Sequence, residues 1–275
     1  MAVATSTTST RFRRGSHGIA RRVRDWTPAI AVAVGFILLW QGAVQLLDIQ
    51  RFVLPAPFAI GQSFVEYFPE IWAAASYTAY EAVGGLVIGV TAGLLVGLIT
   101  GRWVGLRESL LPFAIAVNSV PIIAFAPIMN NWFGLANPLS KMMIAALLVF
   151  FPVMINTVRG LISVDPSALE LMRSTAATDF AVLTKLRIPT ALPFIFTSLK
   201  IAATLATIGA IVGEYFGAPR ASLGQYIVQH AAYFDFERSW AAIILAAAIG
   251  ISLYVAVLIA ERLVMPWHSS VRGVE

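Results

Sequence analysis

The residue types that usually carry covalent chemistry are sparse in this 275-residue chain. There is no cysteine, which excludes disulfides and thiolate metal sites. The three histidines, His17, His230 and His268, are far apart and form no His-Glu-x-x-His zinc motif. Neither a Gly-x-Ser-x-Gly motif nor a Gly-x-x-x-x-Gly-Lys-Ser/Thr loop occurs. We therefore expect a chain that is not an enzyme, has no cofactor and does not bind ATP in the P-loop manner.

The most informative polar residues lie between positions 165 and 189, inside an otherwise apolar sequence. Asp165 can cap a short helix that starts at Pro166, or Ser167 and Glu170 can form a capping box. Leucines and a methionine give this helix an apolar side, which needs a groove to cover it. The residues alone allow two interpretations equally, namely a docking element for a soluble partner and a loop that packs on its own membrane domain.

A second helix is expected after the first, with Thr178 or Asp179 as its cap and Leu183 and Leu186 at helical spacing. Proline lacks the backbone donor that a helix interior needs, so we expect Pro189 to end this helix.

The elements around this segment are predicted to span a membrane, because 59% of the residues are hydrophobic, only 12% are charged and the mean hydropathy is +0.81. A net charge of +5 is explained by basic loops, so no nucleic acid partner is expected. An all-α fold with six transmembrane helices is predicted, at residues 28–47, 77–100, 110–132, 138–158, 193–215 and 239–262.

The positive charges predict the orientation of the chain. With the N-terminus inside, fourteen of the 19 lysines and arginines fall in inner segments and four in outer segments, while Lys200 lies within a span. Both termini are therefore expected in the cytoplasm. The expected organisation is a basic N-terminal tail (1–25), a transmembrane domain (26–265) with a cytoplasmic loop (159–192), and a C-terminal tail (266–275).

Two of the predicted spans have unusual composition. Glycines at every fourth position from Gly85 to Gly97 make a smooth face in the second span, which fits packing within one subunit as well as contact between subunits. The third span is interrupted by prolines and contains asparagines, which predicts irregular backbone beside a water-filled pathway, or a helix kinked only for packing. The candidates for a pathway or gate are Asn118, Pro121, Pro127, Asn130 and Glu214.

Ionisable residues in or near apolar runs are costly and hence candidates for function, and this chain has Glu81, Lys200 and Glu214 there. Glu214 lies near the outer end of the fifth span, where a role in gating is a hypothesis. Lys200 is fourteen positions away, about 21 Å along a helix, so it cannot pair with Glu214 and is expected to extend its amine to the interface.

The segment 170–189 resembles the EAA loop of the inner-membrane permease subunits of binding-protein-dependent ABC importers. Glu170 matches the acid of that motif, and Leu186-Arg187-Ile188-Pro189 matches its closing element at the right distance. Ala176 stands at the usual glycine, which predicts a turn that needs no positive φ. Further segments resemble the nitrate, sulfonate, taurine and thiamine-precursor branch of this family, including residues 54–57, 121–127, 150–152 and 213–215.

This resemblance implies a type I (MetI-like) permease fold, a pair of permeases that is usually a homodimer, two copies of an ATP-binding subunit and an extracytoplasmic solute-binding protein. It implies a bacterial inner-membrane location and a coupling loop that contacts the ATPase. The residues so implied are Glu170, Leu171, Met172, Arg173, Ala176, Asp179, Leu186, Ile188 and Pro189.

The solute expected from the resemblance is a small organic molecule, such as a thiamine-precursor pyrimidine, a riboflavin-like heterocycle, or a sulfonate, taurine or nitrate. The alternative function is a stand-alone secondary transporter driven by an ion gradient, and an intramembrane enzyme is disfavoured by the missing motifs.

Overall fold

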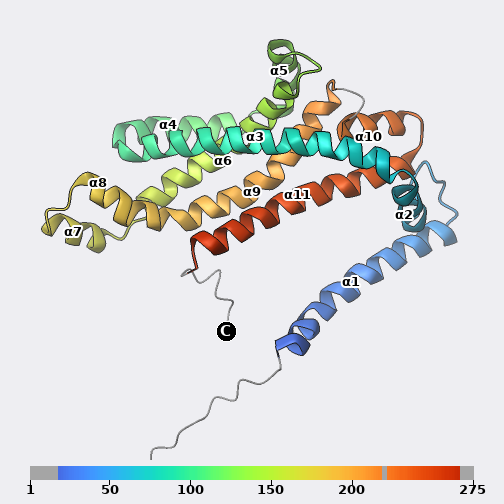
Figure 1. Cartoon of the computed structure of the whole chain (residues 1–275), viewed down its shortest axis with the longest axis horizontal. Coiled ribbons are helices and arrows are strands. Elements are labelled where there is room, and N and C mark those ends of the chain that lie inside the picture. Colours follow the sequence, from blue (N-terminus) through green and yellow to red (C-terminus); the bar gives the residue numbers. More distant parts are fainter. Residues whose placement is uncertain (1–17, 219–221, 267–275) are drawn as a thin grey trace, which may run out of the picture. The chain divides into compact units, whose positions relative to one another are not determined.

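The computed structural model describes residues 18–218 and 222–266, and over these ranges every regular element is a helix (Figure 1). Residues 1–17 and 267–275 of the expected tails, and Arg220, lie outside the described residues. The chain divides into two units, residues 1–58 and residues 59–275, each of which is described by itself.

The first unit contains α1 (Gly18–Leu46), which includes a 20-residue apolar stretch from Thr27 to Leu46. Most of its described large apolar side chains are exposed, as lipid-facing residues of a spanning helix would be, while Val44 is buried. The turn after α1 is held by a hydrogen bond of 3.1 Å from the Phe58 amide to Oε1 of Gln41.

Four long helices form the centre of the second unit. They are α3 (Phe68–Arg102), α6 (Pro138–Ile162), α9 (Ile188–Tyr215) and α11 (Phe236–Val264). Helix α6 packs between α3 and α9, and α11 packs on α9. Short helices α2 (Pro57–Glu66) and α10 (Leu223–Ala232) lie at the end of the bundle opposite α7 (Pro166–Ser174) and α8 (Asp179–Val182) (Figure 1).

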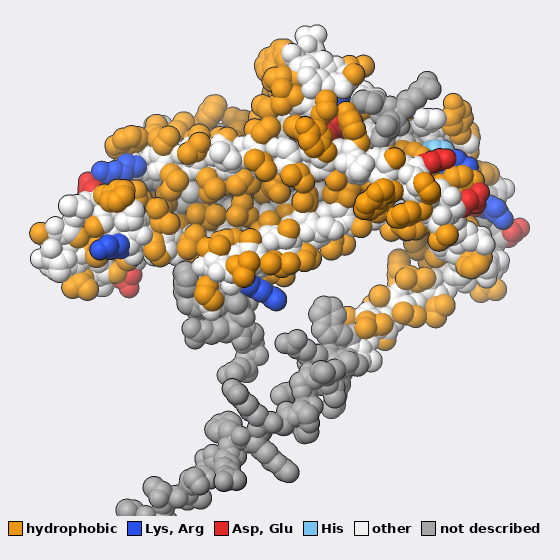
Figure 2. Space-filling view, viewed as in Figure 1, with side chains coloured by type: hydrophobic (Ala, Val, Ile, Leu, Met, Phe, Trp, Pro, Cys, Tyr) orange, Lys and Arg blue, Asp and Glu red, His pale blue; other side chains and the backbone are white. Residues whose placement is uncertain are grey.

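On the face that Figure 2 shows, most charged side chains lie toward the two ends of this bundle, and hydrophobic side chains predominate between them. This distribution is typical of a helical bundle that spans a bilayer, because charged side chains in the hydrocarbon layer cost free energy. In the described residues, five helices are long and apolar enough to cross a membrane, or six if one bent pair counts as a single span. The prediction of an all-α protein with six spans is confirmed when the bent pair is counted so.

The bent pair is the predicted broken third span. Its first half is α4 (Val104–Asn118), and its second half is the 3₁₀ turn η1 (Ile122–Phe125) followed by α5 (Ala126–Phe133). The two halves are bent by 82° relative to each other. Pro121 sits at the break in an extended conformation, and Pro127 lies in the first turn of α5. Pro112 remains inside α4 without ending it.

The glycine face of α3 contacts α6 of the same chain. An added Cβ on Gly89 would lie 2.6 Å from the carbonyl oxygen of Ala146, and one on Gly85 would lie 2.7 Å from that of Met142. The face therefore serves close packing within one subunit, as the first of the two interpretations proposed.

Pro189 does not end the second loop helix, which corrects the expectation. The chain stays helical from Asp179 to Tyr215, through the π-helical turn η2 (Leu183–Arg187). In this turn the Ile188 amide bonds the carbonyl of Leu183, five residues back. Pro189 then falls in the first turn of α9, where a missing backbone donor is tolerated.

Candidate functional site

The N-terminus of α7 forms as the sequence predicted. Asp165 accepts a hydrogen bond of 2.8 Å from the Ser167 amide, and Pro166 occupies the first turn. The alternative capping box does not provide the cap, because Asp165 occupies the N-cap position. Thr178 caps α8 in the same way, accepting from the Ala181 amide at 3.3 Å. Both short helices thus start at side chains that satisfy their free amides.

The C-terminus of α7 differs from the expectation. Ala176 has a φ of 53°, so the turn does require positive φ although its residue is not glycine. The Ala177 amide bonds the Met172 carbonyl at 3.0 Å and the Ala176 amide bonds that of Arg173 at 2.9 Å. These two bonds form a Schellman motif, whose left-handed position usually holds glycine. They impose the left-handed conformation on Ala176 against its side-chain preference.

Helix α7 presents an exposed surface with one large apolar side chain, Leu171, which is 66% exposed. Glu170, Arg173 and Ala176 are exposed beside it, and Met172 is half-buried. The residues predicted for the coupling loop after α7 also differ in exposure. Asp179 and Pro189 are exposed, while Leu186 and Ile188 are half-buried.

Phe180 is a loop residue that sequence reasoning missed. Its side chain is 74% exposed, and it follows directly after the start of α8. An aromatic residue next to a helix cap in a polar loop was the signal that could have identified it.

An ion pair between two exposed side chains links the loop to the bundle through Asp179. Its carboxylate pairs with Arg102, at the C-terminal end of α3, with 2.9 Å between Oδ2 and Nη2. Arg102 was not predicted, because 77 positions separate the two residues and no local pattern connects them.

The pathway candidates around the broken span have different environments. Asn118, Pro121 and Pro127 are exposed, on the unit formed by residues 59–275. Asn130 is buried, and its Nδ2 donates to the Phe216 carbonyl at 3.2 Å. The structure therefore places three candidates on an open face and uses the fourth to hold α5 against the end of α9.

Glu214 is fully buried in the last turn of α9 and holds the start of α10. Its carboxylate accepts from Thr78 Oγ1 at 2.7 Å and from the Gly224 amide at 2.6 Å, and its carbonyl accepts from Gln225 at 2.7 Å. The Leu223 amide donates in turn to Thr78 Oγ1 at 3.0 Å. A carboxylate at a helix N-terminus is favourable because the free amides there carry partial positive charge.

Lys200 pairs with a residue that sequence reasoning did not consider. Its Nζ lies 3.0 Å from Oε2 of Glu261, which joins α9 to α11. The expectation that Lys200 extends its amine to the interface is therefore wrong, because the amine pairs with the Glu261 carboxylate within the bundle.

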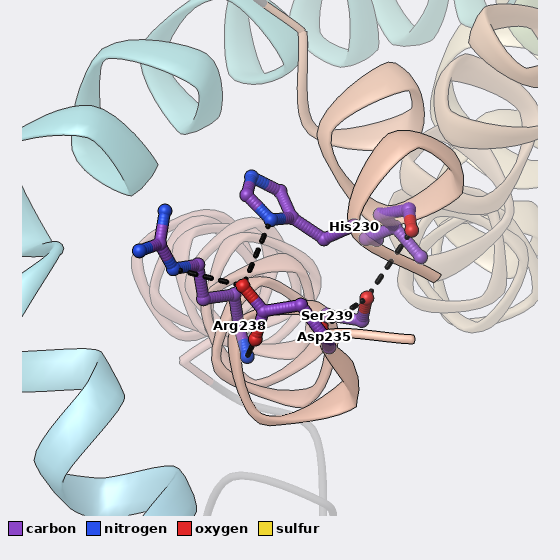
Figure 3. Close-up of polar contacts among 5 residues, drawn as sticks. His230, Asp235, Arg238 and Ser239 are labelled. Carbon is purple, nitrogen blue, oxygen red and sulfur yellow. Dashed lines mark hydrogen bonds and ion pairs between the residues drawn. The ribbon is translucent and has the colours of Figure 1, made fainter. Parts of the chain in front are cut away.

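A polar network stabilises the turn between α10 and α11. His230 and Arg238 both point toward the carboxylate of Asp235 (Figure 3), with Nδ1 and Nε at 3.2 and 3.0 Å from its Oδ2. Arg238 also lies over the ring of Tyr67, 3.3 Å from its centroid. Burial raises the pKa of the nearby Tyr226 phenol, which therefore stays neutral.

Comparison with known proteins identifies relatives over most of the chain. Residues 89–267 match the family described as "Binding-protein-dependent transport system inner membrane component". The riboflavin transport system permease protein RibX of Chloroflexus aurantiacus is 35% identical, over 90% of this chain and 92% of its own length. The formylaminopyrimidine transport permease protein ThiX of Halalkalibacterium halodurans is 29% identical, over 84% and 92%.

A solved structure of an amino acid ABC transporter with histidines has the same fold. It aligns with a TM-score of 0.59 at 18% identity, over 73% of this chain and 97% of its own.

Proposed function

This chain belongs to the family of binding-protein-dependent transport system inner membrane components, the permease subunits of ABC importers, and from this premise we propose how it couples and what it carries. The proposal is that α7 contacts an ATP-binding subunit, that two permeases enclose a pathway, and that a binding protein delivers a small heterocyclic solute on the outer side.

The exposed, capped helix α7 is the observation that carries the coupling role. Leu171 is 66% exposed on a nine-residue helix whose two ends are fixed by Asp165 and by the Schellman bonds. An isolated large apolar side chain on a rigid helix suits insertion into a groove of a soluble partner. The Arg102–Asp179 ion pair then connects a movement of the loop to α3.

The broken third span supports a pathway between two permeases. Its proline-interrupted backbone, exposed at Asn118 and Pro121, needs cover by protein or water at membrane depth. A second copy of the same chain supplies that cover in a homodimer with a central pathway. Glu214 acts in this arrangement by holding the outer helix α10, not by contacting the solute.

We propose the orientation from charge and coupling together. The loop with α7 faces the cytoplasm, as do both termini, because basic residues concentrate in the segments on that side. The outer turn with Asp235 and Arg238 then faces the binding protein.

The proposed solute is a flavin or pyrimidine heterocycle. This assignment is supported by the relatives named for riboflavin and formylaminopyrimidine transport and by the neutral asparagines of the third span. Sulfonate, taurine and nitrate are the competing solutes.

Uptake into proteoliposomes tests the proposal. The chain is reconstituted with its ATPase and binding protein, and uptake of labelled riboflavin and taurine is compared. We expect riboflavin uptake that requires ATP and both partners, and Leu171→Asp should abolish it together with co-purification of the ATPase. Tyr233→Asp, at a 73% exposed position at the opposite end, is the control that retains co-purification. Uptake by the chain alone, driven by an ion gradient, would instead identify a secondary transporter.

A further inference from the structure

Three ionisable side chains are buried together near the outer end of the bundle. Glu81 of α3, Lys141 of α6 and Glu214 of α9 are each 0% exposed. Each of the two carboxyl groups interacts electrostatically with the other residues of the cluster. Two carboxylates and one ammonium would leave one uncompensated negative charge in a buried interior, which is strongly unfavourable.

Glu214 has the environment of an ionised carboxylate. One oxygen accepts from the Thr78 hydroxyl at 2.7 Å and the other from the Gly224 amide at 2.6 Å, at the N-terminus of a ten-residue helix. Ser222 precedes that helix but makes no capping bond of its own, so Glu214 and Thr78 satisfy these amides instead. Charge-assisted hydrogen bonds of this kind stabilise the negative form.

Lys141 has the environment of the compensating cation. Its Nζ donates to the Leu135 carbonyl, and it is the charged group of α6 that faces both glutamates. One lysine neutralises one carboxylate, and the hydrogen bonds of Glu214 select that residue for the ionised form.

Glu81 has the opposite environment. Within residues 18–218 and 222–266, no donor bonds either of its carboxyl oxygens. The neighbour within hydrogen-bonding reach is Glu214, itself an acceptor. An ionised Glu81 would have two desolvated oxygens beside a second carboxylate, whereas a protonated Glu81 is a donor that Glu214 can accept.

We propose that Glu81 and Glu214 form a proton-binding site that holds one proton between their carboxyl groups at neutral pH. The proton is taken from water when the helices assemble, and the cluster then contains one ammonium, one carboxylate and one neutral acid. The site has a structural consequence, because the proton-sharing pair positions the Glu214 carboxylate that holds α10.

In the part of the chain that the structure describes, the phenols of Tyr77 on α3 and Tyr215 on α9 also interact with the pair. Helix α10 contributes the Gly224 amide, which donates to Glu214. The ordinary pKa of a phenol, about 10, keeps both tyrosines neutral over the range in which the pair is tested.

Infrared spectroscopy of the full chain in lipid tests the site directly. At about pH 8, carboxyls with ordinary pKa values of about 4 are ionised, so a carbonyl-stretch band of a protonated acid reports an unusual group. We expect that band in the wild type and its loss in Glu81→Gln, which keeps the size and neutrality of the protonated side chain and should fold. The control is Glu261→Gln, which removes another buried glutamate but one with a direct lysine partner, and which should leave the band unchanged.

The Glu214→Gln variant distinguishes a proton shared by the two carboxyl groups from a Glu81 that is protonated by burial alone. If the pair shares the proton, Glu81 becomes the carboxylate that compensates Lys141 in this variant, and the band disappears. Persistence of the band would show that burial alone protonates Glu81 and would overturn the proposal, as would a wild type without the band or a Glu81→Gln variant that retains it. The measurement requires no transport, so its failure and that of the proposed function are distinguishable.

Discussion

Replacing Gly89 by alanine is the most direct perturbation of the packing that organises the bundle. Its Cβ would meet the Ala146 carbonyl oxygen at 2.6 Å and two carbons of Val149 at 2.8 Å. Carbon atoms pack best at about 3.5–4.0 Å, so α3 and α6 must separate by about 1 Å at this level. Gly85 and Gly93 share the same face, and the separation therefore loosens contacts along both helices.

The expected magnitude follows from two opposing effects. Overpacking of this kind costs about 1–3 kcal/mol, and the contact with backbone places Gly89→Ala toward the upper value. Alanine regains about 1 kcal/mol over glycine through its helix propensity. The net loss is about 1–2 kcal/mol, which corresponds to a fall in Tm of about 2–8 °C for a chain of this size.

The assay is thermal unfolding of the chain in detergent or lipid, followed by circular dichroism. Two glycines provide graded controls. An added Cβ on Gly84 meets the flexible end of Met142, with Sδ at 2.6 Å, and should cost less. Gly61 of α2 has nothing within 4 Å, and Gly61→Ala should leave Tm unchanged or raise it. A Gly89→Ala protein as stable as the wild type, or one less affected than Gly84→Ala, would refute the packing argument.

Three further variants test other contacts. Ala176→Gly removes a left-handed alanine that costs about 1 kcal/mol, so hydrogen exchange at the end of α7 should slow about 5-fold; faster exchange would contradict the cap. Gly224→Ala would place a Cβ 2.6 Å from the Cβ of Glu214, so the amides of α10 should exchange their hydrogens faster. Unchanged hydrogen exchange would show that this contact does not hold α10. Lys200→Met leaves the Glu261 carboxylate, 5% exposed, without its cation, and should cost about 3 kcal/mol in denaturant unfolding. Lys200→Met with Glu261→Gln should recover most of this loss, and no recovery would argue against the pair.

The features that the sequence predicted are those encoded locally. Apolar runs about 20 residues long identified the spans, since bilayer thickness sets that length. Asp165 and Thr178 identified two helix starts, because a cap requires only a side chain and the amides that follow it. Pro121 identified the break in the third span.

The features that were missed or wrong depend on residues far apart in the chain or on cooperative backbone geometry. The partners Arg102 and Asp179, like Lys200 and Glu261, are joined only by the packing of helices. The helix continues through Pro189 because the π-helical turn before it accommodates the backbone donor that proline lacks. Ala176 adopts positive φ because two hydrogen bonds outweigh its preference, which its residue type does not reveal.

Crosslinking at Leu171 tests most directly whether α7 couples this permease to an ATPase. The chain has no cysteine, so Leu171→Cys introduces a single thiol on the exposed surface of α7. In membranes that contain the assembled transporter, a short bifunctional reagent should join this thiol to the ATP-binding subunit, with a yield that changes when ATP is bound. Tyr233→Cys, at the opposite end, should give no such product. Failure of Leu171→Cys to capture the ATPase, or its labelling by a membrane-impermeant maleimide added outside, would contradict the account.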